Sequence, residues 1–416
     1  MQNLRERLIV EQARDYLVTN SLLCQEQHGF LERKSTITNL LQCDALTFNL
    51  LNDGEACDVI ALDFSRAFDK VSHSILSKKL LGVGICGNLH KWFINFLSNR
   101  YQYVSYKGTR SYSVPVTSGV IQGSVCGPQL FSVFINDLPK CVQSTDILLF
   151  ADDGKVVGRA SSPSDCARTQ VDLDAIECWS DVNELPLCLP KCQCLHLGKN
   201  NDGHNYVIGN SIVTPVDSLV DLGVIRSSDY TYSQHIDSVV SKASRVAGML
   251  TRAFATKRPD FQVKLFKAYV RPILEYASVL WNPASVGYVQ LIERVQRRFT
   301  KRLPDLRQLS YEERLGVLHL DALEDRRRQA DLITVFKLLR GHLAIDPSTV
   351  GINLSSAPTR GKGVNIQVQR AINNTIGNSF NYRVPKAWNS LPASVKNASC
   401  SVATFKKLLR NLHSSK

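Results

Sequence analysis

Up to residue 234, short apolar runs and helically spaced apolar positions are separated by polar turn residues. The runs at residues 59–62, 147–151 and 192–197 predict buried strands. Helical spacing predicts helices at residues 72–81, 91–97, 131–138 and 164–184. This order of strands and helices favours an α+β fold and not a doubly wound one.

Three local signals refine this picture. Alternation from Tyr101 to Val116 predicts a hairpin. The first fifty residues predict two helices, with a break at Gly29 and a cap at Ser35-Thr36. Asp153-Gly154 follows the second apolar strand and is typical of a hairpin turn.

From His235 onward the pattern changes to consecutive helices, predicted at residues 237–254, 262–276, 290–302 and 323–339. Residues 341–385 are rich in Gly, Ser, Asn and Thr, which indicates a linker or an irregular module. A short amphipathic helix is expected near the end, at residues 402–412. These changes predict three regions, namely residues 1–234, 235–340 and a flexible linker with a C-terminal module at 341–416.

The charge is divided unevenly between the two parts of the chain. Residues 241–416 contain 30 Lys and Arg against 11 Asp and Glu, whereas residues 1–240 contain 20 against 26, which together give the net charge of +13. A strongly basic rear half favours a polyanionic partner such as nucleic acid, and the alternative is a basic surface without a partner.

No apolar stretch is suited to cross a membrane, because the longest charge-free stretch, residues 111–136, is interrupted by Gly and Pro. The charged N-terminus lacks a signal-peptide core. A location in the nucleus or cytoplasm is therefore expected.

Twelve cysteines are scattered without a disulfide framework, which suits a reducing compartment. One group, Cys188, Cys192 and Cys194 with His196 and His204, leaves two interpretations open. It is either a zinc site or the reduced face of a strand, and the absence of a paired CxxC favours the strand face.

Two carboxylate positions carry the chemistry. Asp63 ends the strand in VIALDFSRAFD, and Asp152 and Asp153 follow the strand in ILLFA. Charged groups at the ends of buried strands need compensation, which a metal ion provides. Mg²⁺ prefers such oxygen ligands, and two ions can activate a hydroxyl and steady a leaving phosphate. For either position alone, the alternative is an ordinary turn.

Together with a third segment, these motifs resemble those of a known family. DVIALDFSRAFDKVSHSIL, SGVIQGSVCGPQLFSVFINDLP and LLFADDGKVV, in this order, are similar to the three palm motifs of reverse transcriptases of jockey-like non-LTR retrotransposons. QHGFLERKSTITNL resembles the fingers motif, and KCQCLHLGKN and VDLGVIRSSDYTYSQHI resemble the next two blocks. A weaker likeness extends to VPKAWNSLP near the C-terminus.

The resemblance implies a right-handed polymerase, with partial fingers, a palm with an antiparallel sheet, and a helical thumb followed by a basic, mainly helical C-terminal region. It implies an RNA-directed DNA polymerase with an RNA template, a DNA primer or target, dNTPs, and two Mg²⁺ ions, which Mn²⁺ could replace.

The resemblance also implies individual roles. Asp63 and Asp152 would bind both ions, with Asp153 in support, and Lys191 would protonate pyrophosphate. Phe68 would lie beneath the incoming sugar and exclude a 2′-hydroxyl. The nucleotide and template would contact Gln122, Gly123 and Lys34, and the primer would contact Leu222 and Gly223. The alternatives are a core aromatic at Phe68 and solvated lysines at Lys34 and Lys191.

One further motif, the glycine pattern typical of dinucleotide-binding sites, is not interpreted as such a site. Residues 82–87 spell G-x-G-x-x-G, but they follow a helix and not a strand, so they predict a helix end and a turn and not a dinucleotide site.

Departures from the family pattern shape the competing hypotheses. The segment that precedes the fingers motif and the endonuclease domain are not found in the sequence, Leu31 replaces the usual arginine, and Cys126 the usual leucine. We therefore expect an N-terminally truncated copy. The alternative to a polymerase is an inactive remnant that only binds nucleic acid; a third hypothesis is another two-metal palm enzyme such as a nucleotide cyclase, which Gln122-Gly123 and the basic rear half disfavour.

Overall fold

The computed structural model describes residues 2–254, 256, 258–355, 364–398 and 401–414. Contacts divide the chain into two units, each described by itself. The first consists of Met1–Asn39 and Gly54–Asp217, and the second of Leu40–Asp53 and Ser218–Lys416. Helix α2, Thr36–Asn52, contributes residues to both units.

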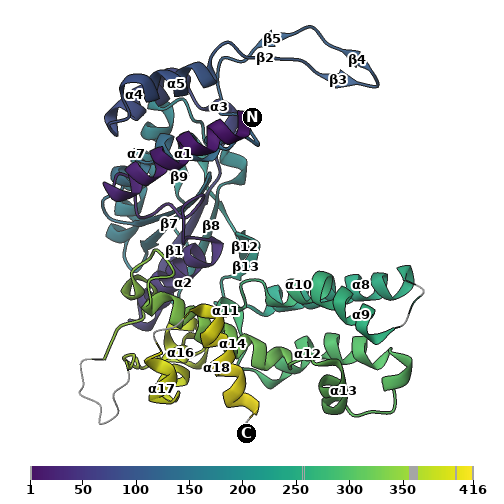
Figure 1. Cartoon of the computed structure of the whole chain (residues 1–416). Coiled ribbons are helices and arrows are strands. Elements are labelled where there is room, and N and C mark those ends of the chain that lie inside the picture. The colour runs from purple at the N-terminus through teal and green to yellow at the C-terminus, as the bar shows by residue number, and fades with distance from the viewer. Residues whose placement is uncertain (1, 255, 257, 356–363, 399–400, 415–416) are drawn as a thin grey trace. The chain divides into compact units, whose positions relative to one another are not determined.

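The first unit contains a central sheet, short helices and an extended hairpin (Figure 1). Its helices are α1 Gln2–Thr19, α3 Ala67–Lys70, α4 His73–Gly82, α5 Gly87–Leu97, α6 Cys126–Phe134, η1 Leu138–Cys141, α7 Pro163–Val182 and η2 Leu189–Lys191. Its strands are β1 Cys57–Leu62, β2 Tyr101–Gln102, β3 Ser105–Tyr106, β4 Thr109–Arg110, β5 Val114–Pro115, β6 Asp146–Phe150, β7 Asp153–Arg159, β8 Gln193–Leu197, β9 Val207–Ile208, β10 Ser211–Ile212 and β11 Thr214–Pro215.

The central sheet has five strands in the order β11-β8-β1-β7-β6. β1 pairs antiparallel with β7 and β8, β7 pairs antiparallel with β6, and only the short β11 is parallel to its neighbour. Helix α7 packs closely on one face, because a Cβ at Gly158 of β7 would lie 2.5 Å from Oγ1 of Thr169. The predicted α+β fold with an antiparallel sheet is confirmed.

The apolar spacing read from the sequence builds one core in this unit. Ile60 of β1, Leu76 of α4, Phe131 of α6 and Leu173 of α7 are all buried in it. Full burial of a side chain of this size stabilises the folded state by about 1.5–3 kcal/mol. The helices therefore fix the sheet that carries the carboxylates.

The β6–β7 turn differs from the prediction. Phe150 pairs with Asp153, so the turn consists of Ala151 and Asp152, and Asp153-Gly154 begins the returning strand. Ala151 adopts a φ of 56°, a left-handed conformation that costs roughly 1–2 kcal/mol for a residue with a Cβ. Tertiary contacts therefore override the local Asp-Gly signal.

Those contacts come from the segment after α1. Oε1 of the buried Gln27 accepts hydrogen bonds from the amides of Gly29 and Ala151, at 2.7 and 2.8 Å, and its Nε2 donates to the carbonyl of Ala151 at 3.2 Å. The amide of His28 donates to the carbonyl of Leu149, which adds this segment to the edge of β6. The turn is thus held by both backbone and side-chain bonds.

Gly29 has a role beyond the break predicted for it. A Cβ at this position would lie 2.3 Å from the amide nitrogen of Ala151, closer than any real side chain approaches a backbone atom. The glycine is therefore required for the close approach of two backbones.

The two remaining local predictions for this unit are confirmed. Strands β2 to β5 form the expected hairpin, with β2 paired to β5 and β3 to β4. The G-x-G-x-x-G segment lies between α4, which ends at Gly82, and α5, which begins at Gly87, so it is a helix end and a turn.

The second unit is predominantly helical. It contains the strands β12 Ser218–Asp221 and β13 Val224–Ser227. Its helices are α8 Ser233–Ala253, α9 Pro259–Leu265, η3 Phe266–Val270, α10 Arg271–Glu275, α11 Ser278–Trp281, α12 Val286–Lys301, η4 Pro304–Leu306, α13 Tyr311–Leu318, α14 Leu323–Leu339, η5 Pro347–Val350, α15 Asn374–Gly377, α16 Phe380–Asn389, α17 Ala393–Lys396 and α18 Val402–Ser414. No helix in the described part of the chain is long and apolar enough to span a membrane.

The two units divide at residues 217/218, so the β12–β13 hairpin belongs to the second unit. A buried ionic network joins this hairpin to α2. Arg226 of β13 pairs with Asp44 of α2 and, at 2.8 Å, with Asp221 of β12, and the hydroxyl of Tyr232 donates to Asp44 at 2.6 Å. These bonds fasten the hairpin to α2, and hence to the second unit.

The C-terminal region packs against α14. Phe405 of α18 stacks on Phe336 of α14, with ring centroids 4.1 Å apart. Arg383 of α16 forms an ion pair with the buried Asp331 of α14 at 2.8 Å. Part of the predicted linker, residues 356–363, lies outside the described residues.

We predict that Gly29→Ala destabilises the protein, because its Cβ must displace the Ala151 backbone. Overpacking of this kind costs about 1–3 kcal/mol. The measurement is the free energy of unfolding from urea titrations of the full chain. Gly82→Ala is the matched control, because a Cβ there has no neighbour within 4 Å. Equal stabilities of the two variants would contradict the prediction.

Candidate active site

The register of the central sheet brings the predicted carboxylates together. Leu62 of β1 is paired with Gly154 of β7, so Asp63 follows one member of the last pair and Asp153 precedes the other. Paired Cα atoms of antiparallel strands lie roughly 4.5–5.5 Å apart. Asp152 occupies the adjoining turn, and its charge and that of Asp63 interact. Asp63, Asp152 and Asp153 thus share one end of the sheet.

Asp63 is held by its backbone on both sides. Its carbonyl accepts a hydrogen bond from the amide of Cys188 at 2.7 Å, and Phe64 forms a bridge with Leu187. Oδ2 of Asp63 is buried, and its ion-pair partner is the exposed ammonium of Lys191. Carboxylate oxygens of this kind are the ligands that Mg²⁺ prefers.

Lys191 lies beside this oxygen. Its Nζ is 3.0 Å from Oδ2 of Asp63, while two thirds of the lysine side chain remains exposed. The neighbouring Asp63 carboxylate raises the pKa of Lys191 above its usual value. The structure therefore brings together two residues that the sequence related only through a family resemblance.

Partial burial raises the pKa of Asp152, and the nearby Asp63 charge raises it further, while its own amide and Lys191 act in the opposite direction. A carboxylate with a raised pKa gains more from a nearby cation, because the cation offsets both the desolvation and the repulsion. The three aspartates therefore fit a site for divalent ions.

Phe68 lies close to this end of the sheet and is half-buried. Its ring stacks on Phe131, with centroids 4.4 Å apart, and meets Phe30 edge-on at 6.0 Å. Both interpretations from the sequence retain support, because the ring packs on the core and also keeps an exposed portion.

The segment around Gln122 and Gly123 is fixed to the helix that carries Phe68. Nε2 of Gln122 donates to Oδ1 of Asp69 at 2.8 Å, and the amide of Val120 donates to the carbonyl of Phe68. Both Gln122 and Gly123 are exposed, and Gly123 has a φ of 82°. The segment thus presents a surface that a ligand can reach.

Sequence reasoning missed two residues of this site. Gln27 fixes the turn that carries Asp152, and Asp69 positions Gln122. Each lies inside a motif that the sequence had singled out, QHGF and DFSRAFD, but only the fold shows its partner.

The remaining predicted contacts differ in what the structure supports. Nζ of Lys34 donates to the carbonyls of Gln25 and Gln27, at 2.5 and 3.1 Å, so it stabilises the loop that holds the β6–β7 turn.

Leu222 and Gly223 form the two-residue turn between β12 and β13, and both have positive φ. The carbonyl of Leu222 accepts a hydrogen bond from Tyr276 at 2.7 Å. These residues thus form a hairpin turn, and its contact with a primer stays a prediction.

The predicted zinc group is reorganised by the fold. Among the described residues, the group whose ligand atoms converge is Asp58, Cys194 and His196, without Cys188, Cys192 or His204. The buried Asp58 carboxylate already lies 2.7 Å from Nδ1 of His196 and accepts hydrogen bonds from Tyr206 and Asn201 at 2.7 and 2.8 Å. Burial raises the pKa of Cys194, which opposes the thiolate that zinc requires. A hydrogen-bonded network on a strand face explains the group, and the eleven described cysteines are free thiols.

Two basic clusters of the second unit, at residues 294–298 and 326–328, differ in exposure. Arg294, Arg297 and Arg298 of α12 are exposed. In contrast, Arg327 is buried and donates to Asn282, and Arg326 is paired with Glu275. Arg326 and Arg327 therefore serve the packing of the helices.

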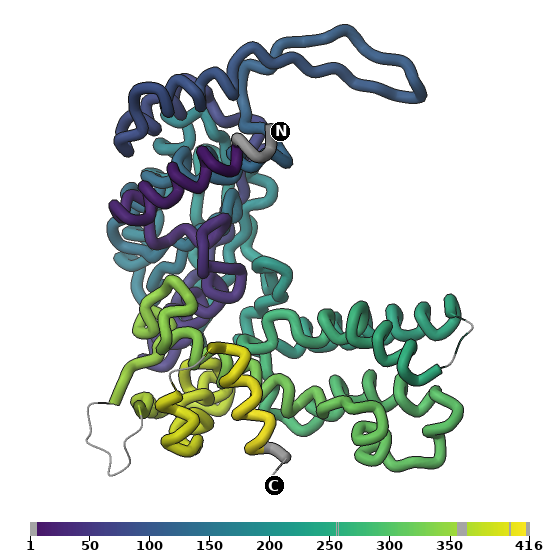
Figure 2. Tube along the Cα trace, viewed as in Figure 1, coloured from purple at the N-terminus to yellow at the C-terminus, as the bar shows by residue number. Residues whose placement is uncertain are grey.

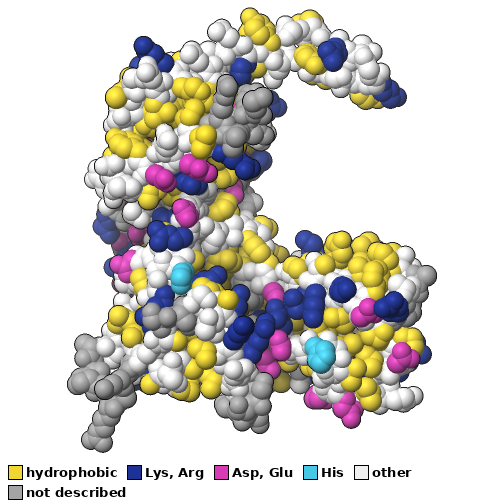
Figure 3. Space-filling model, viewed as in Figure 1, with side chains coloured by type: hydrophobic (Ala, Val, Ile, Leu, Met, Phe, Trp, Pro, Cys, Tyr) yellow, Lys and Arg dark blue, Asp and Glu magenta, His cyan; other side chains and the backbone are white. Residues whose placement is uncertain are grey.

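Exposed cations also gather on α8. Lys242, Arg245 and Arg252 line a hollow of about 660 Å³ together with Arg302, and none of the four forms an ion pair within the described residues. Figure 3 shows Lys and Arg side chains grouped on the helices of this unit. The hollow is suited to an anionic partner.

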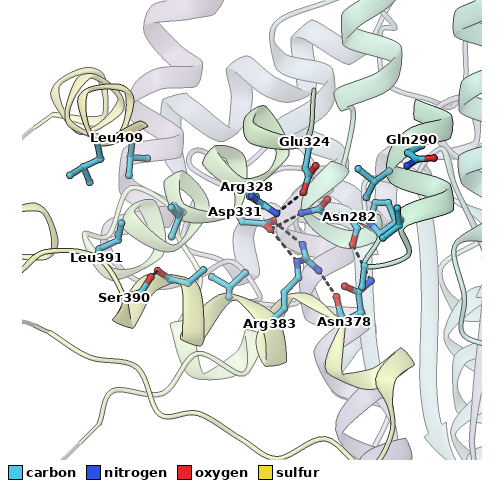
Figure 4. Close-up of a pocket in the computed structure, with 18 of the residues that line it drawn as sticks. Asn282, Gln290, Glu324, Arg328, Asp331, Asn378, Arg383, Ser390, Leu391 and Leu409 are labelled. Carbon is cyan, nitrogen blue, oxygen red and sulfur yellow. Dashed lines mark hydrogen bonds and ion pairs between the residues drawn. The ribbon is translucent and has the colours of Figure 1, made fainter. Parts of the chain in front are cut away.

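A larger pocket of about 920 Å³ in the second unit contains none of the predicted site residues (Figure 4). Asp331 and Arg383 point toward one another across its floor, and Asn282 and Asn378 complete the bonds around them. Leu391 and Leu409 line another part of its wall. Its central charges, Asp331 and Arg383, are already paired with each other.

Comparison with known proteins agrees with the geometry. The family model "Reverse transcriptase (RNA-dependent DNA polymerase)" matches residues 4–233. The "RNA-directed DNA polymerase from mobile element jockey" of Drosophila melanogaster is 24% identical over 310 residues, covering 72% of this chain and 34% of that protein. Its counterpart from Drosophila funebris is 26% identical over 310 residues, with the same shares. The chain thus spans about a third of the length of these relatives.

A shorter match is closer in sequence. The "Probable RNA-directed DNA polymerase from transposon BS" of Drosophila melanogaster is 34% identical over 144 residues, which cover 33% of this chain and 15% of that protein. Among solved structures, apo telomerase from Candida tropicalis aligns over 80% of this chain and 58% of that one, with 9% identity and a TM-score of 0.41.

The family model covers more than half of the chain, including β1, the β6–β7 turn and the segment of Gln122-Gly123. Members of this family use divalent metal ions, for which the three aspartates are suited. The chain belongs to the reverse transcriptase family, and its relatives are polymerases of non-LTR retrotransposons.

Proposed function

We propose that this chain is an RNA-directed DNA polymerase, which transfers nucleotides from dNTPs to the 3′-hydroxyl of a primer on an RNA template. The observation that carries the proposal is the pairing of Leu62 with Gly154, which brings Asp63 beside the turn of Asp152 and Asp153. The site would act in the nucleus or cytoplasm, as part of the replication of a retroelement.

Asp63, Asp152 and Asp153 would hold two Mg²⁺ ions, with Mn²⁺ as a substitute. When bound, the ions supply the positive charge that activates the primer hydroxyl and steadies the departing pyrophosphate. The protein holds the carboxylates rigidly, through the β1–β7 pairing on one side and Gln27 on the other. Such preorganisation lowers the cost of assembling charge in the transition state.

Lys191 supplies a positive charge at the site in addition to the metal ions. Its exposed ammonium can leave Asp63 when cations bind there, and can then donate a proton to the leaving pyrophosphate. A lysine pKa that pairing has raised falls again near cations, which favours this transfer.

Substrate selection is assigned to two surfaces. The exposed portion of Phe68 would lie beneath the sugar and exclude a 2′-hydroxyl, and Gln122 and Gly123 would contact the base pair that forms. The α8 hollow lined by Lys242, Arg245, Arg252 and Arg302 would track a phosphate backbone without reading its sequence. Leu222 and Gly223 would contact the primer.

The alternative expected from the sequence, an inactive remnant that only binds nucleic acid, predicts salt-sensitive RNA binding without nucleotide incorporation.

We predict that Asp152→Asn lowers primer extension on an RNA template by about a thousandfold, which corresponds to ~4 kcal/mol of transition-state stabilisation. The measurement is dNTP incorporation by the full chain with Mg²⁺. Asp174→Asn on the exposed face of α7 is the matched control and should retain activity. Incorporation that survives in Asp152→Asn would refute the assignment, and RNA binding without incorporation by the wild type would favour the remnant.

The raised pKa of Asp152 gives a pH dependence. Protonation of this carboxyl abolishes a metal ligand, so activity should fall as the pH drops, and the fall should begin at a higher pH than for an ordinary aspartate. Higher Mg²⁺ should move the fall to lower pH, because metal and proton compete for one oxygen. A fall that does not respond to Mg²⁺ would assign the titration to another group.

For Phe68 we predict that Phe68→Ala lowers the preference for dNTPs over NTPs by about tenfold to a hundredfold. The measurement is the ratio of kcat/KM for the two nucleotides. Loss of stability without a change in this ratio would instead identify Phe68 as a core aromatic, as its stacking on Phe131 permits.

A further inference from the structure

The hairpin of residues 100–116 carries an unusual surface. In Figure 2 its trace runs outward from the helices of the first unit and returns, and no other segment of that unit lies along it. Four of its tyrosines are exposed, namely Tyr101, Tyr103, Tyr106 and Tyr112, with exposed fractions from 49 to 84%. Tyrosine favours strands, but cross-strand packing would cover the rings, and these rings remain open.

Cations lie beside these rings. The guanidinium of Arg110 is 4.8 Å from the centroid of Tyr103, and Nζ of Lys107 is 5.4 Å from that of Tyr106. The hairpin contains no Asp or Glu, and the whole stretch of residues 70–136 has seven Lys and Arg and no acidic residue. This stretch is positive within a front half that is acidic as a whole.

The base of the hairpin is attached to the segment of the candidate site. Arg100 donates from Nη2 to the carbonyl of Gly119 at 3.2 Å, and from Nε to the carbonyl of Leu97 at 3.0 Å. The amide of Val116 closes the base on the carbonyl of Arg100. Gly119 also accepts from His73 at 2.8 Å and precedes Gln122 by three residues. A strand that reaches Gln122 therefore has the hairpin as a neighbour within the same unit.

We infer that this hairpin binds single-stranded nucleic acid, with bases stacked on its tyrosines and phosphates beside Lys107 and Arg110. Exposed aromatic rings alternating with cations are the chemistry that binds unpaired strands without sequence preference. The inference rests on the proposed function for the identity of the strand, which is the RNA template before it pairs. A duplex offers no free base faces to the rings, so the hairpin should prefer unpaired RNA.

The test compares two triple variants of the full chain, Tyr103→Ala/Tyr106→Ala/Tyr112→Ala and the matched Tyr103→Phe/Tyr106→Phe/Tyr112→Phe. Binding to fluorescent oligo(U) RNA and oligo(dT) is measured by anisotropy, with EDTA and without nucleotides. The alanine variant should bind at least about tenfold more weakly, whereas the phenylalanine variant, which keeps the rings, should stay within about twofold of the wild type. Thermal melting should be the same for all three proteins, since the rings are exposed.

Weaker binding of oligo(U) alone, or of both oligo(U) and oligo(dT), by the alanine variant supports the inference. The comparison of the two probes shows whether the sugar contributes to binding. Unchanged binding by the alanine variant overturns it and leaves a protein partner for the hairpin. Equal losses in both variants overturn the stacking, because the hydroxyls would then carry the affinity. Cross-links from 4-thiouridine RNA to wild-type protein should map to residues 100–116, and cross-links confined to other segments would also overturn it.

This assay does not need catalysis. A chain that binds RNA through the hairpin but extends no primer would refute the proposed function and leave this inference in place. A chain that extends primers equally well with and without the three rings, and binds RNA equally well, would refute the inference alone.

Discussion

The pairing of β1 with β7 is the constraint on which the chemistry depends. Like charges at one end of a sheet repel one another, as Asp63 and Asp152 do. The register withstands this cost because the buried side chains of β1, α4, α6 and α7 fix the strands well below the acidic end. Because the core holds the carboxylates in place, bound cations offset the repulsion between them. The core that stabilises the fold therefore also favours the binding of metal ions.

The sequence was informative where a local pattern decides the structure. The runs at 59–62 and 147–151 became β1 and β6, the alternation after Tyr101 became a hairpin, and the aspartates met where the strand ends predicted. It was misleading at the β6–β7 turn, because the Asp-Gly signal is local whereas the bonds from Gln27 cross more than a hundred residues. A contact between residues so far apart in the chain cannot be predicted from the periodicity of apolar residues.

The rear half also contains contacts that a local pattern does not reveal. Arg326, Arg327 and Arg328 form a basic run in the sequence, but a helix directs consecutive residues to different faces, so Arg327 is buried and Arg328 is exposed. Asp44 and Arg226, far apart in the chain, form one buried pair that the sequence does not reveal. A count of charges cannot distinguish a basic side chain that binds a partner from one that forms bonds between packed helices.

At two glycines near the site, the surrounding backbone leaves no room for a side chain. Gly29 lies against Ala151, and Gly119, with a φ of 86°, lies where a Cβ would be 2.7 Å from the carbonyl oxygen of Asp69. Every glycine codon becomes an alanine codon by a single base change. A gene copy released from selection can therefore lose the position of the Asp152 turn or of the Gln122 segment while every aspartate is still encoded. These two glycines are thus as informative about an intact site as the aspartates themselves.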